Sequence, residues 1–263
     1  MRPMCPMRPK SIYGNQTIQV LDLVLSHFQP PIFPRTISTK LTENKQIVVY
    51  NKEEALERFE AADWLDCKIS AYPDFTGWKG INRQAPDFIF IELDLGRLGT
   101  KELNKALVEA LKTIKDKLGG KPSVIWSGHG YHIYQPVNAV ILENITEFAE
   151  FDQPSRGLIR FAEQHLSSNK SDPCHYSTMS VKNCMLRVPG SYNTKNERKI
   201  GVSIIQKWNG CRPSIKPLLF SLCLHLHDLK LNKIRNQTNE HYSHSSKFCP
   251  LFYSIILSLE AKE

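Results

Sequence analysis

Two acidic side chains stand in an otherwise apolar run at residues 87–95, which reads DFIFIELDL. This run predicts a mostly buried β-strand, in which residues two apart point to the same face. Glu92 and Asp94 should therefore leave the strand side by side. Such a pair of carboxylates is unfavourable unless a positive group neutralises it, and a divalent metal ion does so. The strand thus indicates metal-assisted phosphoryl chemistry; the alternative is one solvated acid beside one ion-paired acid.

A glycine-rich turn follows between two strand-like runs. Gly128 and Gly130 flank His129, so the backbone here can turn tightly or approach a ligand closely. A hairpin would place Ser127 at the end of the outgoing strand and His132 just past the turn on the returning one. A hydroxyl, exposed backbone N–H groups and an imidazole together suit a polyphosphate. The alternative is a glycine-rich hairpin with a surface histidine.

A third acid and a basic cluster come later in the chain. Asp172 precedes a proline, which favours an extended backbone that can hold out a carboxylate. Arg187 sits in an apolar run, and a half-buried arginine usually has an anionic partner. Only Glu197 opposes the basic residues of this region, which suit a nucleic-acid backbone unless they form an ordinary solvated loop. These basic residues are Lys182, Arg187, Lys195, Arg198 and Lys199.

The segments that must position these residues alternate between helical and strand-like patterns, which predicts a mixed α/β fold. Asn51 and Thr100 are expected to cap two of the helices. Residues 231–247 are polar and are expected to form a linker. The predicted helices cover residues 17–28, 52–65, 101–118 and 154–166. The predicted strands cover residues 46–50, 66–72, 87–95, 123–127, 131–135 and 201–208.

Composition sets outer limits on function. The chain has 263 residues, 41% of them hydrophobic and 23% charged, which is ordinary for a globular protein with a substantial core. Its net charge of +8 is compatible with nucleic acid as a partner. The seven cysteines form no Cys-x-x-Cys motif, which favours free thiols in a reducing compartment. We find no signal-like or membrane-spanning stretch and expect a cytoplasmic protein with no membrane partner.

These motifs, in this order, resemble the archaeo-eukaryotic primase superfamily. The acid-x-acid strand, the small-x-His element Gly130-Tyr131-His132, the Asp-Pro and the later Arg-x-Pro-Gly correspond to the family's pattern over residues 45–210. The likeness is greatest to the primase-polymerases of archaea and of their plasmids and viruses. The family usually begins its first motif with aspartate, whereas this chain has Glu92, whose longer arm would shift a bound metal ion.

The resemblance implies an α/β primase catalytic core with an RRM-like half. The catalytic domain would span residues 41–215, after an N-terminal extension (1–40) with one helix and before a C-terminal helical or linker tail (216–263). Two Mg²⁺ or Mn²⁺ ions would be held by Glu92, Asp94 and Asp172. Nucleotide phosphates would be bound by Ser127, Gly128, Gly130, His132 and Arg187. The template would be contacted by Lys182, Lys195, Arg198 and Lys199.

The expected activity is that of a DNA primase that also extends primers as a polymerase, acting in DNA replication. Its partners would be a single-stranded DNA template, ribonucleoside or deoxyribonucleoside triphosphates, and a helicase or other replication proteins. A structural zinc is not expected, because the spacing of Cys174, His175, Cys184 and Cys211 matches no common zinc pattern. Two alternatives stay open: a two-metal nuclease or replication initiator, and a non-catalytic nucleic-acid-binding subunit.

Overall fold

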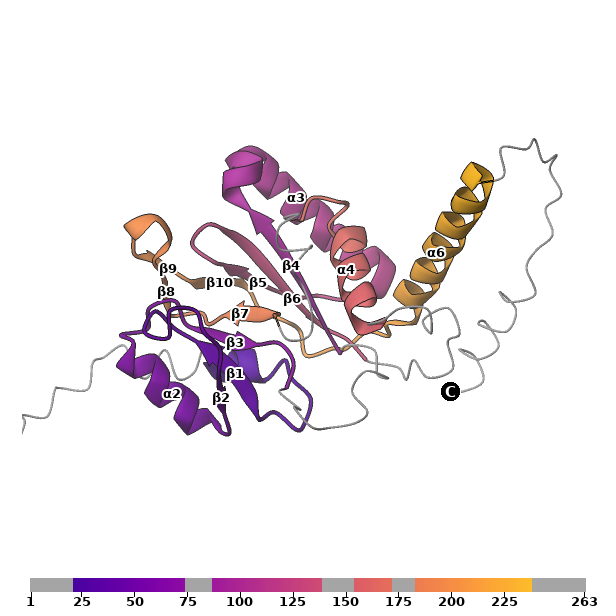
Figure 1. Ribbon diagram of the computed structural model, residues 1–263. Coiled ribbons are helices and arrows are strands. Elements are labelled where there is room, and N and C mark those ends of the chain that lie inside the picture. Colours follow the sequence, from indigo (N-terminus) through magenta and orange to yellow (C-terminus); the bar gives the residue numbers. More distant parts are fainter. Residues whose placement is uncertain (1–20, 74–86, 139–153, 172–182, 238–263) are drawn as a thin grey trace, which may run out of the picture.

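The computed structural model describes residues 21–73, 87–138, 154–171 and 183–237. In these parts of the chain, strands and helices form a mixed α/β fold, which confirms the predicted fold class (Figure 1). In chain order the elements are β1 (Arg35–Ser38), β2 (Ile47–Val49), α2 (Lys52–Ala61), β3 (Lys68–Ser70), β4 (Phe88–Asp94), α3 (Leu95–Leu118), β5 (Ser123–Trp126), β6 (Gly130–Pro136), α4 (Pro154–Leu166), β7 (Met185–Arg187), β8 (Tyr192–Asn193), the 3₁₀ helix η3 (Lys195–Glu197), β9 (Ile200–Gly201), β10 (Ser203–Gln206) and α6 (Lys216–Gln237).

The first sheet is antiparallel with the strand order β2-β1-β3-β7. Ile37, Ile69 and Leu186 lie at matching positions on neighbouring strands, and all three are fully buried. They share a core with Phe59 of α2 and with residues 21–28. Helix α2 begins as predicted, because the side chain of its N-cap, Asn51, accepts a hydrogen bond from the first turn.

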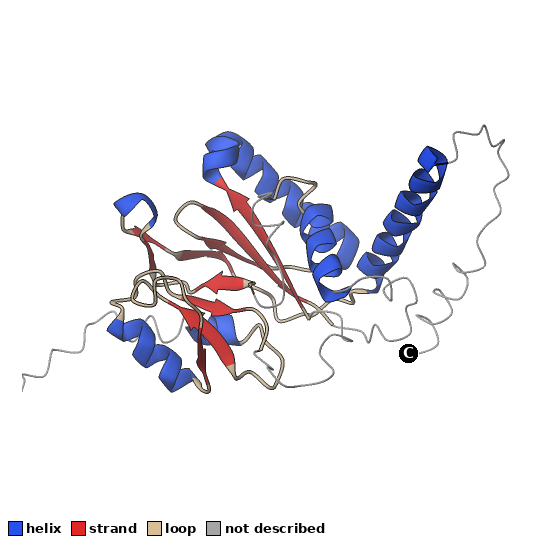
Figure 2. Ribbon diagram, viewed as in Figure 1, coloured by secondary structure: helices blue, strands red, loops and turns tan. Residues whose placement is uncertain are grey.

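The second sheet is also antiparallel, with the order β10-β5-β6-β4, so β4 is an edge strand. Successive side chains of β4 point to opposite faces of the sheet. Ile91 and Leu93 face a core that α3, α4 and α6 complete, whereas Phe88 and Phe90 belong to the core shared with the first sheet. Helices therefore cover one face of this four-stranded sheet, and the core shared with the first sheet lies on the other face. Figure 2 shows α3 and α4 along this sheet and α2 beside the first sheet.

The beginning of α3 differs from the prediction. We expected a helix over residues 101–118 with Thr100 as its cap, but α3 begins at Leu95 and its N-cap is Asp94. The helix is broken at Gly99, whose φ of 72° and ψ of 162° are not helical. The early turn escaped sequence reasoning because the two glycines at 96 and 99 are poor helix formers. One acid of the predicted metal pair therefore also starts a helix.

Other boundaries were partly wrong. The expected linker at residues 231–247 begins inside α6, which continues to Gln237. The strand expected over residues 201–208 is divided between β9 and β10. The predicted helix at 17–28 begins outside the described residues, but residues 21–25 are helical.

The described parts of both chain ends pack on the central region. Strand β1 pairs with β2 and β3, and α6 shares the core of α3 and α4. None of the described helices is both long and apolar enough to cross a membrane.

Candidate functional site

The two acids of β4 lie side by side, as their spacing predicts. Phe88, Phe90, Glu92 and Asp94 share one face of the strand, and the acids occupy its C-terminal end. The Glu92 side chain is 28% exposed and that of Asp94 is 18% exposed, so both are half-buried. Half-buried carboxylates keep a path to a solvent ion while their positions are fixed by a packed strand.

His132 lies directly across from Glu92 on β6. The backbone N–H of Leu95 donates to the His129 carbonyl, and the backbone N–H of Val137 donates to the Asp87 carbonyl. These two positions are hydrogen-bonded pairs, and hydrogen-bonded and non-hydrogen-bonded pairs alternate along the ladder between them. Glu92 and His132 therefore form a non-hydrogen-bonded pair, the closer of the two cross-strand spacings. Their side chains meet, with His132 Nε2 lying 3.5 Å from Glu92 Oε1.

The other ring nitrogen of His132 faces Tyr134. The Tyr134 hydroxyl donates its proton to the backbone carbonyl of Arg187 at 3.1 Å, so its oxygen can only accept from His132 Nδ1, 3.4 Å away. If Nδ1 carries the proton of the neutral ring, Nε2 carries one only when the ring is charged. His132 then presents an N–H to an anion at the position of Glu92 or of a bound phosphate.

Asp94 has two roles that can be separated. Its Oδ1 accepts a hydrogen bond from the backbone N–H of Arg97 at 3.2 Å, which caps α3. Its Oδ2 lies 3.7 Å from Nζ of Lys195, a largely exposed side chain on η3. Lys195, expected on the template, therefore lies close enough to the acid pair to stabilise its charge.

The turn between β5 and β6 has the predicted hairpin geometry. Gly128 has a φ of 95°, a conformation that side chains rarely adopt, and a Cβ on Gly130 would lie 2.0 Å from the Leu93 carbonyl oxygen. The turn therefore requires both glycines. The Ser127 hydroxyl donates to the Gly130 carbonyl, so its contact with a phosphate stays a prediction. Asn193 supports the loop by donating its side-chain N–H to the Ser127 carbonyl at 2.8 Å.

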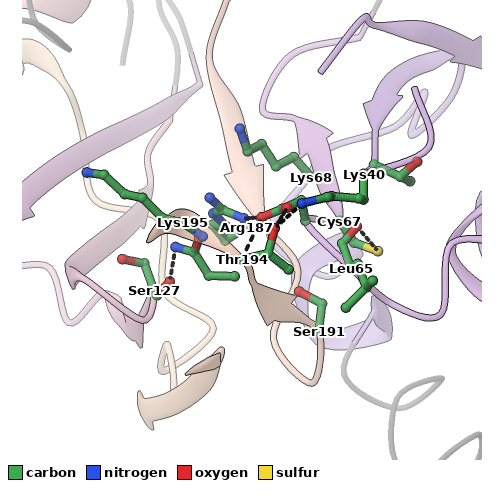
Figure 3. Close-up of polar contacts among 12 residues, drawn as sticks. Lys40, Leu65, Cys67, Lys68, Ser127, Arg187, Ser191, Thr194 and Lys195 are labelled. Carbon is green, nitrogen blue, oxygen red and sulfur yellow. Dashed lines mark hydrogen bonds and ion pairs between the residues drawn. The ribbon is translucent and has the colours of Figure 1, made fainter. Parts of the chain in front are cut away.

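Arg187 has the anionic partner that its sequence context predicts. Its guanidinium donates to Oδ1 of Asp66 at 2.8 Å, and Thr194 donates both its backbone N–H and its hydroxyl to the same carboxylate (Figure 3). Partial burial acts to raise the pKa of Asp66, but the bonds from Thr194 and Arg187 outweigh it and lower that pKa below its ordinary value. The binding of a nucleotide by Arg187 stays a prediction.

The other predicted template contacts are only partly described. Arg198 and Lys199 are exposed beyond η3, and Lys199 Nζ lies 4.0 Å from the centre of the Tyr192 ring. Lys182 and Asp172 lie outside the described residues. The grouping of all three acids is therefore not visible, and binding of the template by the basic residues stays a prediction.

The acid pair fits a hard divalent cation in donor chemistry. Glu92 and Asp94 offer carboxylate oxygens from adjacent same-face positions, the ligands that Mg²⁺ and Mn²⁺ prefer. Within the described residues no group of three or more histidine, cysteine, aspartate or glutamate side chains could hold a metal ion. A complete ligand set thus needs a donor from elsewhere in the chain or from the substrate, and Asp172 is the acid that the sequence predicts.

Two of the cysteines expected to be free thiols differ in exposure. Cys184 is fully buried, and burial raises the pKa of its thiol well above the ordinary value. Cys211 is exposed. Cys174 and His175 lie outside the described residues.

Two supporting acids were missed by sequence reasoning. Glu163 of α4 is fully buried, and its Oε1 accepts the backbone N–H of Glu92 at 3.3 Å, on the open edge of β4. Asp66 holds Arg187 from a turn in which its φ is 53°, a conformation that aspartate tolerates. A lone glutamate in an amphipathic helix and an acid at a strand entry carry no sequence signal for these contacts.

No protein-family model matches the chain, and no curated protein matches it. Two solved structures are similar to it. One is a crystal structure of the primase RepB′, with a TM-score of 0.48 and 14% identity over 94% of this chain and 69% of that chain. The other is the catalytic domain of primase RepB′ in complex with initiator DNA, with a TM-score of 0.47 and 15% identity over 84% of this chain and 98% of that chain. Both are likenesses of overall fold at low identity.

Proposed function

We propose that this chain is a primase: a template-directed nucleotidyltransferase that joins nucleotides on single-stranded DNA and extends the resulting primers. One observation carries the proposal. Glu92 and Asp94 leave one face of β4 together, and His132 meets Glu92 from the neighbouring strand. Acids for a metal ion and a titratable donor for a phosphate are thus held within one rigid sheet.

The acid pair, together with Asp172, would hold the Mg²⁺ or Mn²⁺ ions. When bound, such ions activate an attacking hydroxyl and stabilise a leaving pyrophosphate. The protein supplies the positions: the ladder between β4 and β6 fixes both acids, Glu163 holds the backbone of Glu92, and the cap of α3 orients Asp94.

The incoming nucleoside triphosphate would be held from the hairpin side. His132 in its charged form offers Nε2–H to a phosphate oxygen, and Tyr134 keeps the ring oriented through Nδ1. The glycine turn lets the backbone approach a polyphosphate closely. The exposed cations Lys195, Arg198 and Lys199 would contact the template backbone in a salt-dependent manner that does not read its sequence.

The test is nucleotide incorporation. The protein is incubated with single-stranded DNA, Mn²⁺ and labelled nucleoside triphosphates, and products are separated by size. We expect labelled oligomers from the wild type and a loss of about 10³-fold in Glu92→Gln, which keeps the shape of the side chain and removes its charge. Template cleavage without incorporation would point to a nuclease instead. Equal, negligible incorporation by both proteins would favour a non-catalytic nucleic-acid-binding subunit.

A further inference from the structure

A second cation stands beside Arg187. Lys68 of β3 lies directly opposite Arg187 of β7. Val188 donates its backbone N–H to Cys67, one position along the ladder, so Lys68 and Arg187 form a non-hydrogen-bonded pair with the closer cross-strand spacing. Their side chains share one side of the sheet (Figure 3), while the neighbouring Ile69 is buried on the other side.

Two like charges at this spacing repel each other. Asp66 compensates Arg187 through an ion pair at 2.8 Å. Lys68 forms no ion pair with any carboxylate in the part of the chain that the structure describes; its ammonium donates only a long hydrogen bond of 3.4 Å to Asn44. Lys68 therefore has no ion pair of its own within the described residues, and a bound anion would compensate its charge.

The environment of Lys68 strengthens this asymmetry. Burial lowers the pKa of its ammonium group, and the charge of Arg187 lowers it further, while Asp66 and Glu92 act in the opposite direction. Lys68 is thus within electrostatic range of Glu92 on the other sheet. An anion bound here would be stabilised by two cations in a partly buried environment. It would also lie near the acid pair.

We propose that Lys68 and Arg187 form an anion site that binds a phosphate group of the substrate, an inference that rests on the proposed function for the identity of that substrate. The phosphate belongs either to the nucleoside triphosphate or to the nucleic-acid backbone. Lys68 is a residue that the motif pattern does not mark, because a single lysine in a short strand looks like any solvated side chain.

The test measures anion binding rather than catalysis. Thermal unfolding of the full chain is followed with increasing inorganic tripolyphosphate, and separately with a single-stranded oligonucleotide, in buffer without divalent ions. A ligand that binds only the folded state raises Tm according to its Kd. In Lys68→Met we expect a Kd about tenfold weaker for one of the two probes, as for loss of one charge-assisted hydrogen bond. Lys68→Arg should retain binding.

The matched control is Lys112→Met, which removes an equal charge from the exposed surface of α3. This variant should keep the wild-type Kd for both probes. Without ligand, Lys68→Met should have a Tm equal to or above that of the wild type, because a like-charge contact is gone. A merely structural lysine would instead lower Tm on removal.

The outcomes distinguish the two possible sources of the phosphate, and they distinguish failure of the anion site from failure of the proposed function. A weaker Kd for tripolyphosphate assigns the site to the nucleotide, and a weaker Kd for the oligonucleotide alone assigns it to the backbone. An unchanged Kd for both probes in Lys68→Met, or no binding of either by the wild type, overturns the anion site. Lys68-dependent binding in a protein that incorporates no nucleotide would contradict the proposed function alone.

Discussion

The two sheets each place one pair of titratable residues at the closest cross-strand spacing, but the pairs differ in charge. In the second sheet, Glu92 meets His132, a side chain that is positively charged when protonated. In the first sheet, Lys68 meets Arg187, and of these two only Arg187 forms an ion pair with a carboxylate in the described chain. A protonated histidine would offset the glutamate in the first of these pairs, whereas the proposed anion would offset the two cations of the second.

This difference separates two factors: backbone geometry determines which residues meet, and residue type determines which ligand they can bind. The same ladder register brings both pairs together. The residue types then determine the ligand: carboxylates select a cation, and the lysine–arginine pair selects an anion. A metal-bound nucleoside triphosphate contains both kinds of charge, so changes to each pair should have separable effects.

Removing the charge of Asp94 should cause the largest loss of activity, because it leaves β4 with only one of its two acids. We expect Asp94→Asn to lose about 10³-fold in nucleotide incorporation, because the charge that holds a metal ion is gone. Its stability should stay at the wild-type value, because asparagine caps a helix as well as aspartate does. Asp94→Ala should lose the same activity and, in addition, about 1 kcal/mol in the free energy of unfolding. Incorporation assays and urea unfolding of both variants separate the two roles.

Replacing Glu163, which supports the backbone of Glu92, should have the next largest effect, on stability. Glu163→Ala leaves the Glu92 backbone N–H without its acceptor and opens a space in a fully buried site. We expect the free energy of unfolding to fall by about 2–3 kcal/mol, measured by urea denaturation. Glu163→Gln, which retains an acceptor oxygen, is the control and should lose less. Equal losses in the two variants would show that the charge, rather than the hydrogen bond, is what α4 contributes.

Replacing Asp66, which forms the ion pair with Arg187, should have a smaller effect on stability, and this effect should depend on pH. Asparagine tolerates the positive φ at position 66, so Asp66→Asn mainly removes charge. We expect a loss of about 1–2 kcal/mol at neutral pH. Because folding lowers the pKa of Asp66, its stabilisation is complete above the ordinary aspartate pKa and disappears as the pH falls through the folded-state value.

The measurement is the free energy of unfolding of both proteins between neutral and acidic pH. The difference between wild type and Asp66→Asn should shrink toward acidic pH. A difference that stays constant with pH would mean that the ion pair with Arg187 contributes little.

The fold was predictable where one physical signal dominated. Strand β4, the hairpin between β5 and β6, and α4 were found from apolar runs, paired glycines and helical spacing. Strand β1 and strand β7 were missed because runs of three or four residues become strands only through their partners. The end of α6 was misplaced because its polar final turns resemble a linker.

The candidate site divides in the same way. Glu92, Asp94 and His132 were predicted together because each follows from a local pattern, and the ladder confirms that they meet. Lys68, Asp66 and Glu163 were missed because their roles depend on partners about 70 to about 120 positions away in the sequence. A sequence alone does not show which charge lies opposite which.

Shortening Glu92 should give the smallest effect and sharpen the comparison, because it changes the reach of the acid and leaves its charge intact. In Glu92→Asp, β4 still fixes the backbone, and the contact of 3.5 Å with His132, a distance too long for a strong hydrogen bond, is lost. We therefore expect incorporation within about threefold of the wild type. Single-turnover rates with Mg²⁺ and Mn²⁺ measure this. A loss of tenfold or more with both ions would show that the longer arm is required, and that His132 and Glu92 act as a unit.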